Sequence, residues 1–246
     1  MNIQKLKNNP RLPQHIALII DGNGRWAKKR GMVRMIGHKY GFENLKKQIE
    51  FVRELGIKNL SLYCFSAENW KRPKKEVDYL MQLFDQMLDE YEKEYLNQDV
   101  RVIISGDMSD ERIPVNIRQK AVKLMQQTKS KTGFILNPCI NYGGQQEVLM
   151  AVNKCIADGV TTITKEELEK RLYSAELLPL DFVIRTSGEQ RTSNFMVWQA
   201  SYAEWSFPKT YWPAFTKYDL VKALKNYLKR ERRFGAIKED KWKRDF

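Results

Sequence analysis

Short apolar runs alternate with longer amphipathic segments along most of the chain. The runs predict strands at 15–20, 59–65, 100–105, 133–141, 182–184 and 204–207. Apolar positions three and four residues apart predict helices at 40–55, 73–95, 114–129, 145–157, 164–172 and 217–233, with another helix starting at Arg25. This alternation is typical of parallel sheets. We therefore expect a single-domain α/β fold, with a mostly parallel six-stranded sheet covered by helices on both faces.

The two ends of the chain differ from this pattern. Residues 1–14 predict a loose basic lead-in that is interrupted by two prolines, and residues 236–246 predict a basic C-terminal tail. Between them, residues 15–235 contain no repeat and no low-complexity linker, which indicates one domain. The N-terminus lacks an apolar signal core, and the longest apolar runs are only of strand length. We therefore expect a cytoplasmic protein.

Composition narrows the choice of partners. The chain has 246 residues and a net charge of +13, and 42% of its residues are hydrophobic, which is enough for a buried core. The positive charge favours anionic partners: phosphates, a membrane surface or nucleic acid. Three widely spaced cysteines predict reduced core thiols, and two histidines are too few for a histidine-rich metal site.

The first predicted strand runs directly into a glycine-rich turn, Asp21-Gly-Asn-Gly24, and then into a helix. Gly22 and Gly24 would let backbone N–H groups approach a phosphate. The Asp21 carboxylate would repel that phosphate unless a divalent cation lay between them, and its hard oxygen atoms suit Mg²⁺. The stretch therefore predicts a metal-assisted diphosphate site. Two alternatives stay open: a turn in which Asp21 only caps the helix, and a dinucleotide fingerprint ending at Ala27.

A second polar loop follows the predicted strand at 182–184. Arg185, Arg191 and Ser193 form a candidate anion site, because arginine makes paired hydrogen bonds to phosphate oxygens. Glu204 follows and could share a metal with Asp21. Polar clusters also follow the strands that end near Phe65 and Ser105, where ligands of parallel sheets bind. The apolar stripe of the helix at 77–95 is either core or the wall of an apolar cavity.

Absent motifs exclude several enzyme classes. The chain has no G-x-x-x-x-G-K-[ST] segment, so it is not a P-loop nucleoside triphosphatase, and it has no D-D-x-x-D segment of the kind that trans-prenyltransferases use. No Ser-His-Asp or Cys-His arrangement stands out. Two anion sites beside an apolar cavity suggest two phosphorylated apolar substrates.

Five blocks of sequence resemble the cis-prenyltransferase family, in the family's order. They are Asp21-Gly-Asn-Gly-Arg-Trp-Ala27, Gly37-His-Lys-Tyr-Gly41, Phe65-Ser-Ala-Glu-Asn-Trp-Lys-Arg-Pro73, Asn141-Tyr-Gly-Gly144 and residues 184–195. Tyr202-Ala-Glu204 and Arg230-Glu-Arg-Arg-Phe-Gly235 also match, so the resemblance spans nearly the whole chain. Ile20, Ala67 and Thr192 depart from the usual residues, but none of these changes removes a charged or metal-binding group.

The resemblance implies a catalytic domain over 15–235 that adds isopentenyl diphosphate, with cis geometry and Mg²⁺ as cofactor, to an allylic diphosphate such as farnesyl diphosphate. The expected product is a long-chain polyprenyl diphosphate, undecaprenyl diphosphate, the precursor of the cell-wall lipid carrier. The alternative is a short-chain or irregular synthase of the same fold. The resemblance also implies a homodimer, and the basic tail suggests transient contact with the inner face of the membrane. Nucleic acid is not an expected partner. A non-catalytic partner subunit is disfavoured, because the active-site residues are kept.

Residue roles follow from the resemblance by position. Asp21 and Asn69 would be catalytic, and Asp21 and Glu204 would bind the metal. The allylic diphosphate would contact Gly22, Asn23, Gly24, Arg25, Arg34 and His38, and Trp26 would also bind substrate. The isopentenyl diphosphate would contact Arg185, Arg191 and Ser193. A mobile loop over the substrates would include Ser66, Glu68, Asn69, Trp70 and Arg72. For Trp26, Trp70 and His38, simple burial in the core is the alternative.

Two further expectations concern the C-terminal segment and the apolar tunnel for the substrate chain. Arg233-Phe-Gly235 resembles a family ending that reaches a neighbouring active site in the dimer. An apolar substrate tunnel would be walled by the helix at 77–95 and by strands that include Ile103 and Ile135.

Overall fold

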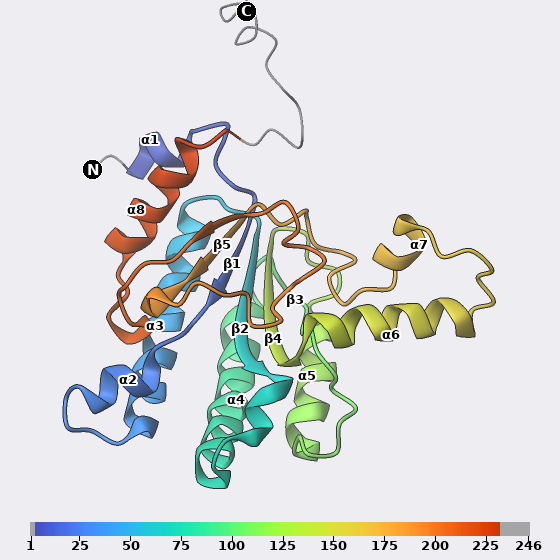
Figure 1. The fold of residues 1–246 in the computed structure, drawn as a ribbon, viewed down its shortest axis with the longest axis horizontal. Coiled ribbons are helices and arrows are strands. Elements are labelled where there is room, and N and C mark those ends of the chain that lie inside the picture. The colour runs from blue at the N-terminus through green and yellow to red at the C-terminus, as the bar shows by residue number, and fades with distance from the viewer. Residues whose placement is uncertain (1–2, 232–246) are drawn as a thin grey trace, which may run out of the picture.

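One sheet of six strands organises the computed structural model, which describes residues 3–231 (Figure 1). The strands are β1 (His15–Ile19), β2 (Asn59–Ser66), β3 (Val100–Val102), β4 (Phe134–Tyr142), β5 (Phe182–Arg185) and β6 (Glu204–Ser206). Their order is β3-β4-β2-β1-β5-β6, and every neighbouring pair is parallel. The α/β prediction is confirmed, and the sheet is entirely rather than mostly parallel. All five residues of β1 are buried, as expected of a central parallel strand.

Eight α-helices are present within the described residues. They are α1 (Ile3–Lys7), α2 (Asn23–Lys28), α3 (Arg34–Glu54), α4 (Lys74–Tyr95), α5 (Val115–Gln127), α6 (Gly144–Ala157), α7 (Lys165–Glu169) and α8 (Lys217–Leu228). Short 3-10 helices lie at η1 (Ala67–Lys71), η2 (Thr186–Gly188) and η3 (Trp212–Ala214). Within residues 3–231, no helix combines the length and apolar character that a membrane span requires.

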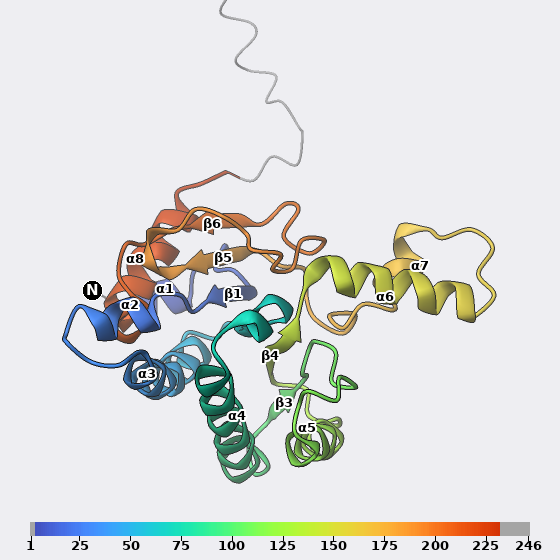
Figure 2. The same cartoon turned by 60° about the horizontal axis from the view of Figure 1, so that its bottom comes forward.

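The two faces of the sheet are covered differently. The largest core cluster joins one face to buried side chains of α3, α4, α5 and α8, and Figure 2 shows α3 and α4 side by side on that face. The opposite face, around Ala17 and Val183, packs against Leu180, Phe195 and Met196, which lie in irregular segments before and after β5. This face therefore carries turns where we expected helices. The helix α6 instead extends away from the end of β4 (Figure 1).

Several element boundaries differ from those predicted. The lead-in contains the helix α1, which forms because Leu6 is buried in the main core. The helix α3 begins at Arg34 rather than near residue 40. Its two early glycines do not break it: a Cβ at Gly37 would lie 2.0 Å from the Asn23 carbonyl oxygen, so these glycines permit close packing of α2 on α3. The strand β3 ends at Val102, and Ser105 makes only an isolated bridge.

The C-terminal expectations fall largely outside the described residues. The helix α8 ends at Leu228, before the predicted residue 233. The segment Arg233-Phe-Gly235 and the tail 236–246 lie beyond residue 231, so the structure does not describe them.

A buried histidine lies at the start of β1. His15 is 1% exposed, and its Nδ1 lies 2.7 Å from the Leu178 carbonyl oxygen, which can only accept. Nδ1 therefore donates to that carbonyl, and Nε2 lies 2.8 Å from Ser61 Oγ. Burial lowers the pKa of His15 to about 4, against the opposing effect of the Leu178 carbonyl.

This histidine predicts a loss of stability in mild acid. The folded pKa of about 4 lies below the unfolded value near 6.5, so the unfolded chain binds more protons between these values. The contribution of His15 is complete above pH 6.5 and falls by roughly 3 kcal/mol as the pH drops to 4. Urea unfolding of wild type and His15→Asn at pH 7.5, 5.5 and 4.5 measures it. The wild type should lose more stability than the variant, and equal losses would contradict this assignment.

Candidate active site

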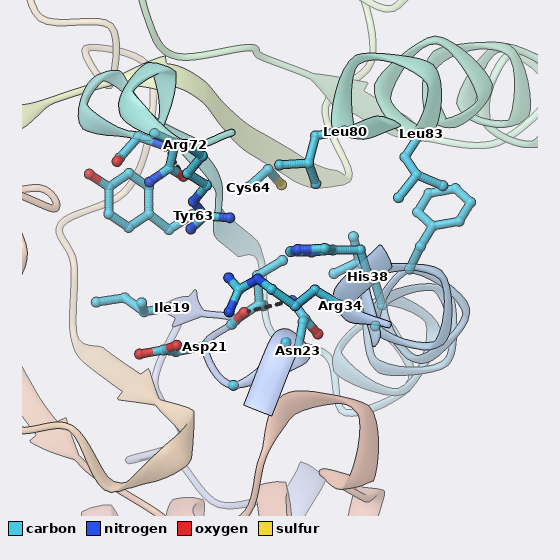
Figure 3. Close-up of a pocket in the computed structure, with 18 of the residues that line it drawn as sticks. Ile19, Asp21, Asn23, Arg34, His38, Tyr63, Cys64, Arg72, Leu80 and Leu83 are labelled. Carbon is cyan, nitrogen blue, oxygen red and sulfur yellow. Dashed lines mark hydrogen bonds between the residues drawn. The ribbon is translucent and has the colours of Figure 1, made fainter. Parts of the chain in front are cut away.

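A cavity of about 260 Å³ opens at the carboxyl ends of β1, β2 and β5, against α2, α3 and α4 (Figure 3). Its polar lining comprises Asp21, Gly22, Asn23, Gly24, Arg25, Arg34, His38, Ser66, Asn69, Arg72, Arg185 and Ser193. Its apolar lining includes Ile19, Ile20, Phe42, Leu45, Leu80, Leu83, Phe84 and Met87. Leu80 and Leu83 reach in from α4 on the side away from Asp21 (Figure 3). The cavity therefore has one charged end and one apolar end.

Asp21 lies between two arginines that come from different parts of the chain. Arg185 Nη2 donates to Oδ2 at 2.9 Å, and Arg25 Nη2 donates to Oδ1 at 3.1 Å. Burial alone would raise the pKa of the Asp21 carboxyl, but the hydrogen bonds and charges of Arg185 and Arg25 hold it below its usual value. Asp21 is therefore ionised at neutral pH and fixes both guanidinium groups at the cavity.

Arg185 also shapes the loop that follows β5. Its Nη1 donates to Ser193 Oγ at 2.7 Å and to the Arg191 carbonyl oxygen at 2.6 Å. Ser187 and Ser193 have left-handed backbones, with φ of 76° and 50°, so the loop folds back around the guanidinium. The buried Nε of Arg185 has no hydrogen-bond partner among the described residues. An unpaired buried donor beside Ser193 is consistent with a site for an anion.

Glu189 forms ion pairs with two arginines at the outer edge of this site. Its carboxylate pairs with Arg25 and, at 2.5 Å, with Arg191. Arg191 is 61% exposed and does not line the cavity, in contrast to Arg185. A phosphate that binds these guanidinium groups would therefore compete with the Glu189 carboxylate.

Three basic side chains contact the carboxylate of Glu76 at the start of α4. Glu76 Oε2 accepts from Arg34 Nε at 3.0 Å, and Oε1 lies 3.1 Å from both His38 Nε2 and Arg72 Nη1. Glu76 is 8% exposed at its side chain. Burial alone would raise its pKa, but hydrogen bonds from Arg34 and His38 and the charge of Arg72 lower the pKa to about 2.

The segment between β2 and α4 supplies a third side of the cavity. Asn69 Oδ1 accepts from the Ser66 backbone N–H at 3.2 Å, which closes a capping box at η1. Ser66, Asn69 and Arg72 line the cavity. Glu68 points to the β5 loop instead, where its Oε1 accepts from Asn194 Nδ2 at 3.1 Å. The segment is thus tied to the loop that carries Ser193.

Two predicted binding tryptophans do not line the cavity. Trp26 packs against Tyr40, with ring centroids 4.9 Å apart, and Arg30 lies over its ring at 4.3 Å. Trp70 packs edge-on against Phe65 at 5.0 Å. Trp26 thus joins α2 to α3, Trp70 packs under its own segment, and their contact with substrate stays a prediction. Glu68 also lies outside the lining.

The structure does not bring Glu204 to Asp21 within one chain. Glu204 pairs in register with Phe182, the first residue of β5, whereas Arg185 at the other end of β5 is level with Ile19. Its carboxylate accepts from Arg230 Nη1 at 2.7 Å. Within residues 3–231, no group of three or more His, Cys, Asp or Glu side chains could hold a metal ion. Metal binding by Asp21 and Glu204 together therefore stays a prediction.

Asp21 alone still fits one kind of metal site. Mg²⁺ keeps several waters and is often held by one or two carboxylates together with substrate phosphates. An ionised carboxylate surrounded by phosphate-binding side chains offers that donor set. Asp21 would therefore hold the ion against a bound diphosphate.

The apolar end of the cavity lies along part of the predicted tunnel wall. Leu80, Leu83, Phe84 and Met87 of α4 line the cavity and also belong to the main core. Ile103 and Ile135 do not line it. The sequence did not predict a role for Glu76 or for Tyr63, which lines the cavity. The spacing of Arg72 and Glu76, four residues apart at a helix start, is the signal that could have found the first.

Known proteins of similar sequence and fold agree on the class of this protein. Residues 19–235 match the prenyltransferase family described as "Putative undecaprenyl diphosphate synthase". The chain belongs to this family and is a prenyltransferase.

Two relatives named isoprenyl transferase show how far the similarity extends. That of Thermotoga maritima is 46% identical over 92% of this chain and 98% of the relative, and that of Bacillus anthracis is 44% identical over 92% and 89%. Among solved structures, lavandulyl diphosphate synthase from Lavandula x intermedia in complex with dimethylallyl diphosphate has a TM-score of 0.84 and 32% identity, covering 92% of this chain and 99% of that one. "A probable undecaprenyl diphosphate synthase" from Campylobacter jejuni has a TM-score of 0.75 and 34% identity, covering 91% and 99%.

Proposed function

We propose that this prenyltransferase adds isopentenyl diphosphate units to an allylic diphosphate, which is the most direct use of a cavity with one charged and one apolar end. The observation that carries the proposal is the position of Asp21 between Arg185 and Arg25. Arg25 lies in α2 and Arg185 ends β5, so the Asp21 carboxylate would stand between two sets of phosphate-binding side chains. The apolar side chains of α4 would hold the growing hydrocarbon.

The two diphosphates would bind on either side of Asp21. Arg34 and His38, with the turn Gly22-Asn23-Gly24, would hold the allylic diphosphate, while Arg185 and Ser193 would hold the isopentenyl diphosphate, with Arg191 at the rim. In the reaction, the allylic C–O bond breaks and diphosphate leaves with its electron pair. The isopentenyl double bond supplies the pair for the new C–C bond, and loss of a proton forms the new double bond.

The chain's own residues would supply orientation and charge. Holding both diphosphates fixes the reacting carbons near each other, and guanidinium groups stabilise the leaving diphosphate. Bound Mg²⁺ would neutralise charge on that leaving group. Asn69 lies at the cavity beside Ser66, where it could contact the reacting ends of both substrates.

The finer proposal is a long-chain cis product, undecaprenyl diphosphate, made from farnesyl diphosphate as a precursor of the cell-wall lipid carrier. The family description and the name of the Campylobacter jejuni structure support the undecaprenyl product. It includes a homodimer in the cytoplasm that contacts the inner face of the membrane transiently. A short-chain or irregular synthase is the second candidate, favoured by the similarity to lavandulyl diphosphate synthase.

An elongation assay tests the proposal. Purified protein is incubated with farnesyl diphosphate, labelled isopentenyl diphosphate and Mg²⁺, with and without chelator, and the products are sized by chromatography. We expect long labelled products that disappear with chelator and return with added Mg²⁺. A single short or branched product, from farnesyl or dimethylallyl diphosphate, would favour the second candidate. No incorporation with either primer would contradict both.

A further inference from the structure

Four side chains behind the cavity form a closed ring of contacts. Trp70 Nε1 donates to Asn141 Oδ1 at 2.8 Å, and Asn141 Nδ2 donates to Asp110 Oδ2 at 3.1 Å. Arg112 donates to the same Asp110 carboxylate, through Nε at 2.9 Å and Nη2 at 2.5 Å. The guanidinium of Arg112 then returns over the Trp70 ring, 4.7 Å from its centroid. Each member therefore contacts two others.

Asn141 is the member of this ring that links Trp70 to Asp110. It is 5% exposed, and its side-chain amide also donates to the Asp107 carbonyl oxygen at 2.8 Å, so both N–H groups and the oxygen have partners. Its backbone is left-handed, with a φ of 49°, which asparagine tolerates better than most residues. Asparagine thus satisfies both the backbone at the end of β4 and three hydrogen bonds.

The base of the ring is held firmly to the sheet. Gly106 has a φ of 133°, and a Cβ there would lie 1.8 Å from the Ile140 carbonyl oxygen, so the loop from 106 to 112 lies directly against β4. The Asp107 N–H also donates to the Asn141 carbonyl oxygen at 3.2 Å. On the other side, Arg112 is 58% exposed, so this member can separate from Trp70 without disturbing the core.

The ring reaches the cavity only through the segment that contains Trp70. Neither Trp70 nor its three partners line the cavity, whereas Asn69 and Arg72, on either side of Trp70, do. Arg72 in turn donates to Glu76, which holds Arg34 and His38. Holding Trp70 in place therefore also holds Asn69 and Arg72, and Arg72 is one of the three basic residues around Glu76.

We propose that Asn141, Asp110 and Arg112 are positioning residues that hold the segment 66–73 in its substrate-binding arrangement through Trp70. The inference rests on the proposed function, since it assigns the segment to diphosphate binding. Releasing the ring would weaken binding of the allylic diphosphate more than it slows the chemical step, because Asn69 and Arg72 would sample other positions in the free enzyme.

Two substitutions and one matched control test this proposal. Trp70→Phe removes the indole N–H and keeps a ring on Phe65, and Arg112→Gln removes the exposed cation. Trp198→Phe is the control, because Trp198 Nε1 donates to Glu169 Oε1 at 3.0 Å beside α7, away from the cavity. Hydrogen–deuterium exchange of residues 66–73 is measured on each full-length protein, together with kcat and KM for farnesyl diphosphate.

We expect exchange of 66–73 to be about tenfold faster in Trp70→Phe and Arg112→Gln, and unchanged in Trp198→Phe. The KM for farnesyl diphosphate should rise about tenfold in the first two, with kcat altered less than about threefold. Exchange within twofold of wild type in both variants would overturn the proposal, as would faster exchange with an unchanged KM. If wild type incorporates no label, the proposed function fails, while the exchange measurement still shows whether the ring holds the segment.

Discussion

Replacing Asp21 with asparagine should abolish elongation, with kcat lowered by about 10³-fold. The substitution keeps the shape of the side chain but removes the charge that fixes Arg185 at 2.9 Å and Arg25 at 3.1 Å. It also removes the carboxylate that would hold Mg²⁺ against a diphosphate. Loss of the metal-binding carboxylate acts on the leaving allylic diphosphate, and release of Arg185 disturbs the isopentenyl diphosphate.

The control for this variant is Asp158→Asn. Asp158 also pairs with an arginine, Arg171, at 2.8 Å, but it lies beyond α6 and outside the cavity. Labelled isopentenyl diphosphate incorporation should be normal in this control, and both variants should unfold cooperatively. Asp21→Asn with activity within tenfold of wild type would contradict the role assigned to Asp21.

Replacing Glu76 with glutamine should have the second largest effect. The neutral amide can no longer balance Arg34, His38 and Arg72, which then lose their common anchor. We expect the KM for the allylic diphosphate to rise by about 10- to 100-fold. Unpairing a buried ion-pair group costs about 3–5 kcal/mol, so urea unfolding should also show reduced stability.

Acid unfolding measures the contribution of the Glu76 carboxylate to stability independently of activity. Its folded pKa of about 2 lies below the ordinary value of 4.5, so its stabilising contribution is present above pH 4.5 and is lost as the pH falls to about 2. The glutamine variant should lack this component. Glu90→Gln is the control, because Glu90 also joins α4 to α3, through Lys46 at 2.5 Å, away from the cavity. Equal KM values for the two variants would contradict the assignment.

The sequence predicts local chemistry well in this protein. The buried run His15–Ile19 followed by Asp21 and two glycines specifies a strand, a turn and a helix without help from distant residues. The same holds for Arg185 and Ser193, which follow a buried strand and meet the first turn because parallel strands end at one edge of the sheet.

Features that depend on distant packing could not be predicted in the same way. The sequence predicts a helix from residue 40, but close packing of Asn23 on Gly37 and Gly41 accompanies a helix α3 that begins at Arg34. The position of Glu204 depends on the register of β6 on β5, which the sequence of the intervening loop does not specify. Glu76 lies within an ordinary amphipathic helix, and only its three basic neighbours reveal its role.

Equilibrium binding of the two diphosphates tests the central claim most directly. Wild type, Arg34→Gln and Arg185→Gln are titrated by calorimetry, in Mg²⁺, with isopentenyl diphosphate and with a non-reactive thio analogue of farnesyl diphosphate. The structure predicts one molecule of each ligand per wild-type chain, loss of the analogue in Arg34→Gln and loss of isopentenyl diphosphate in Arg185→Gln. A single shared site, or the same ligand lost from both variants, would contradict two diphosphate sites on either side of Asp21.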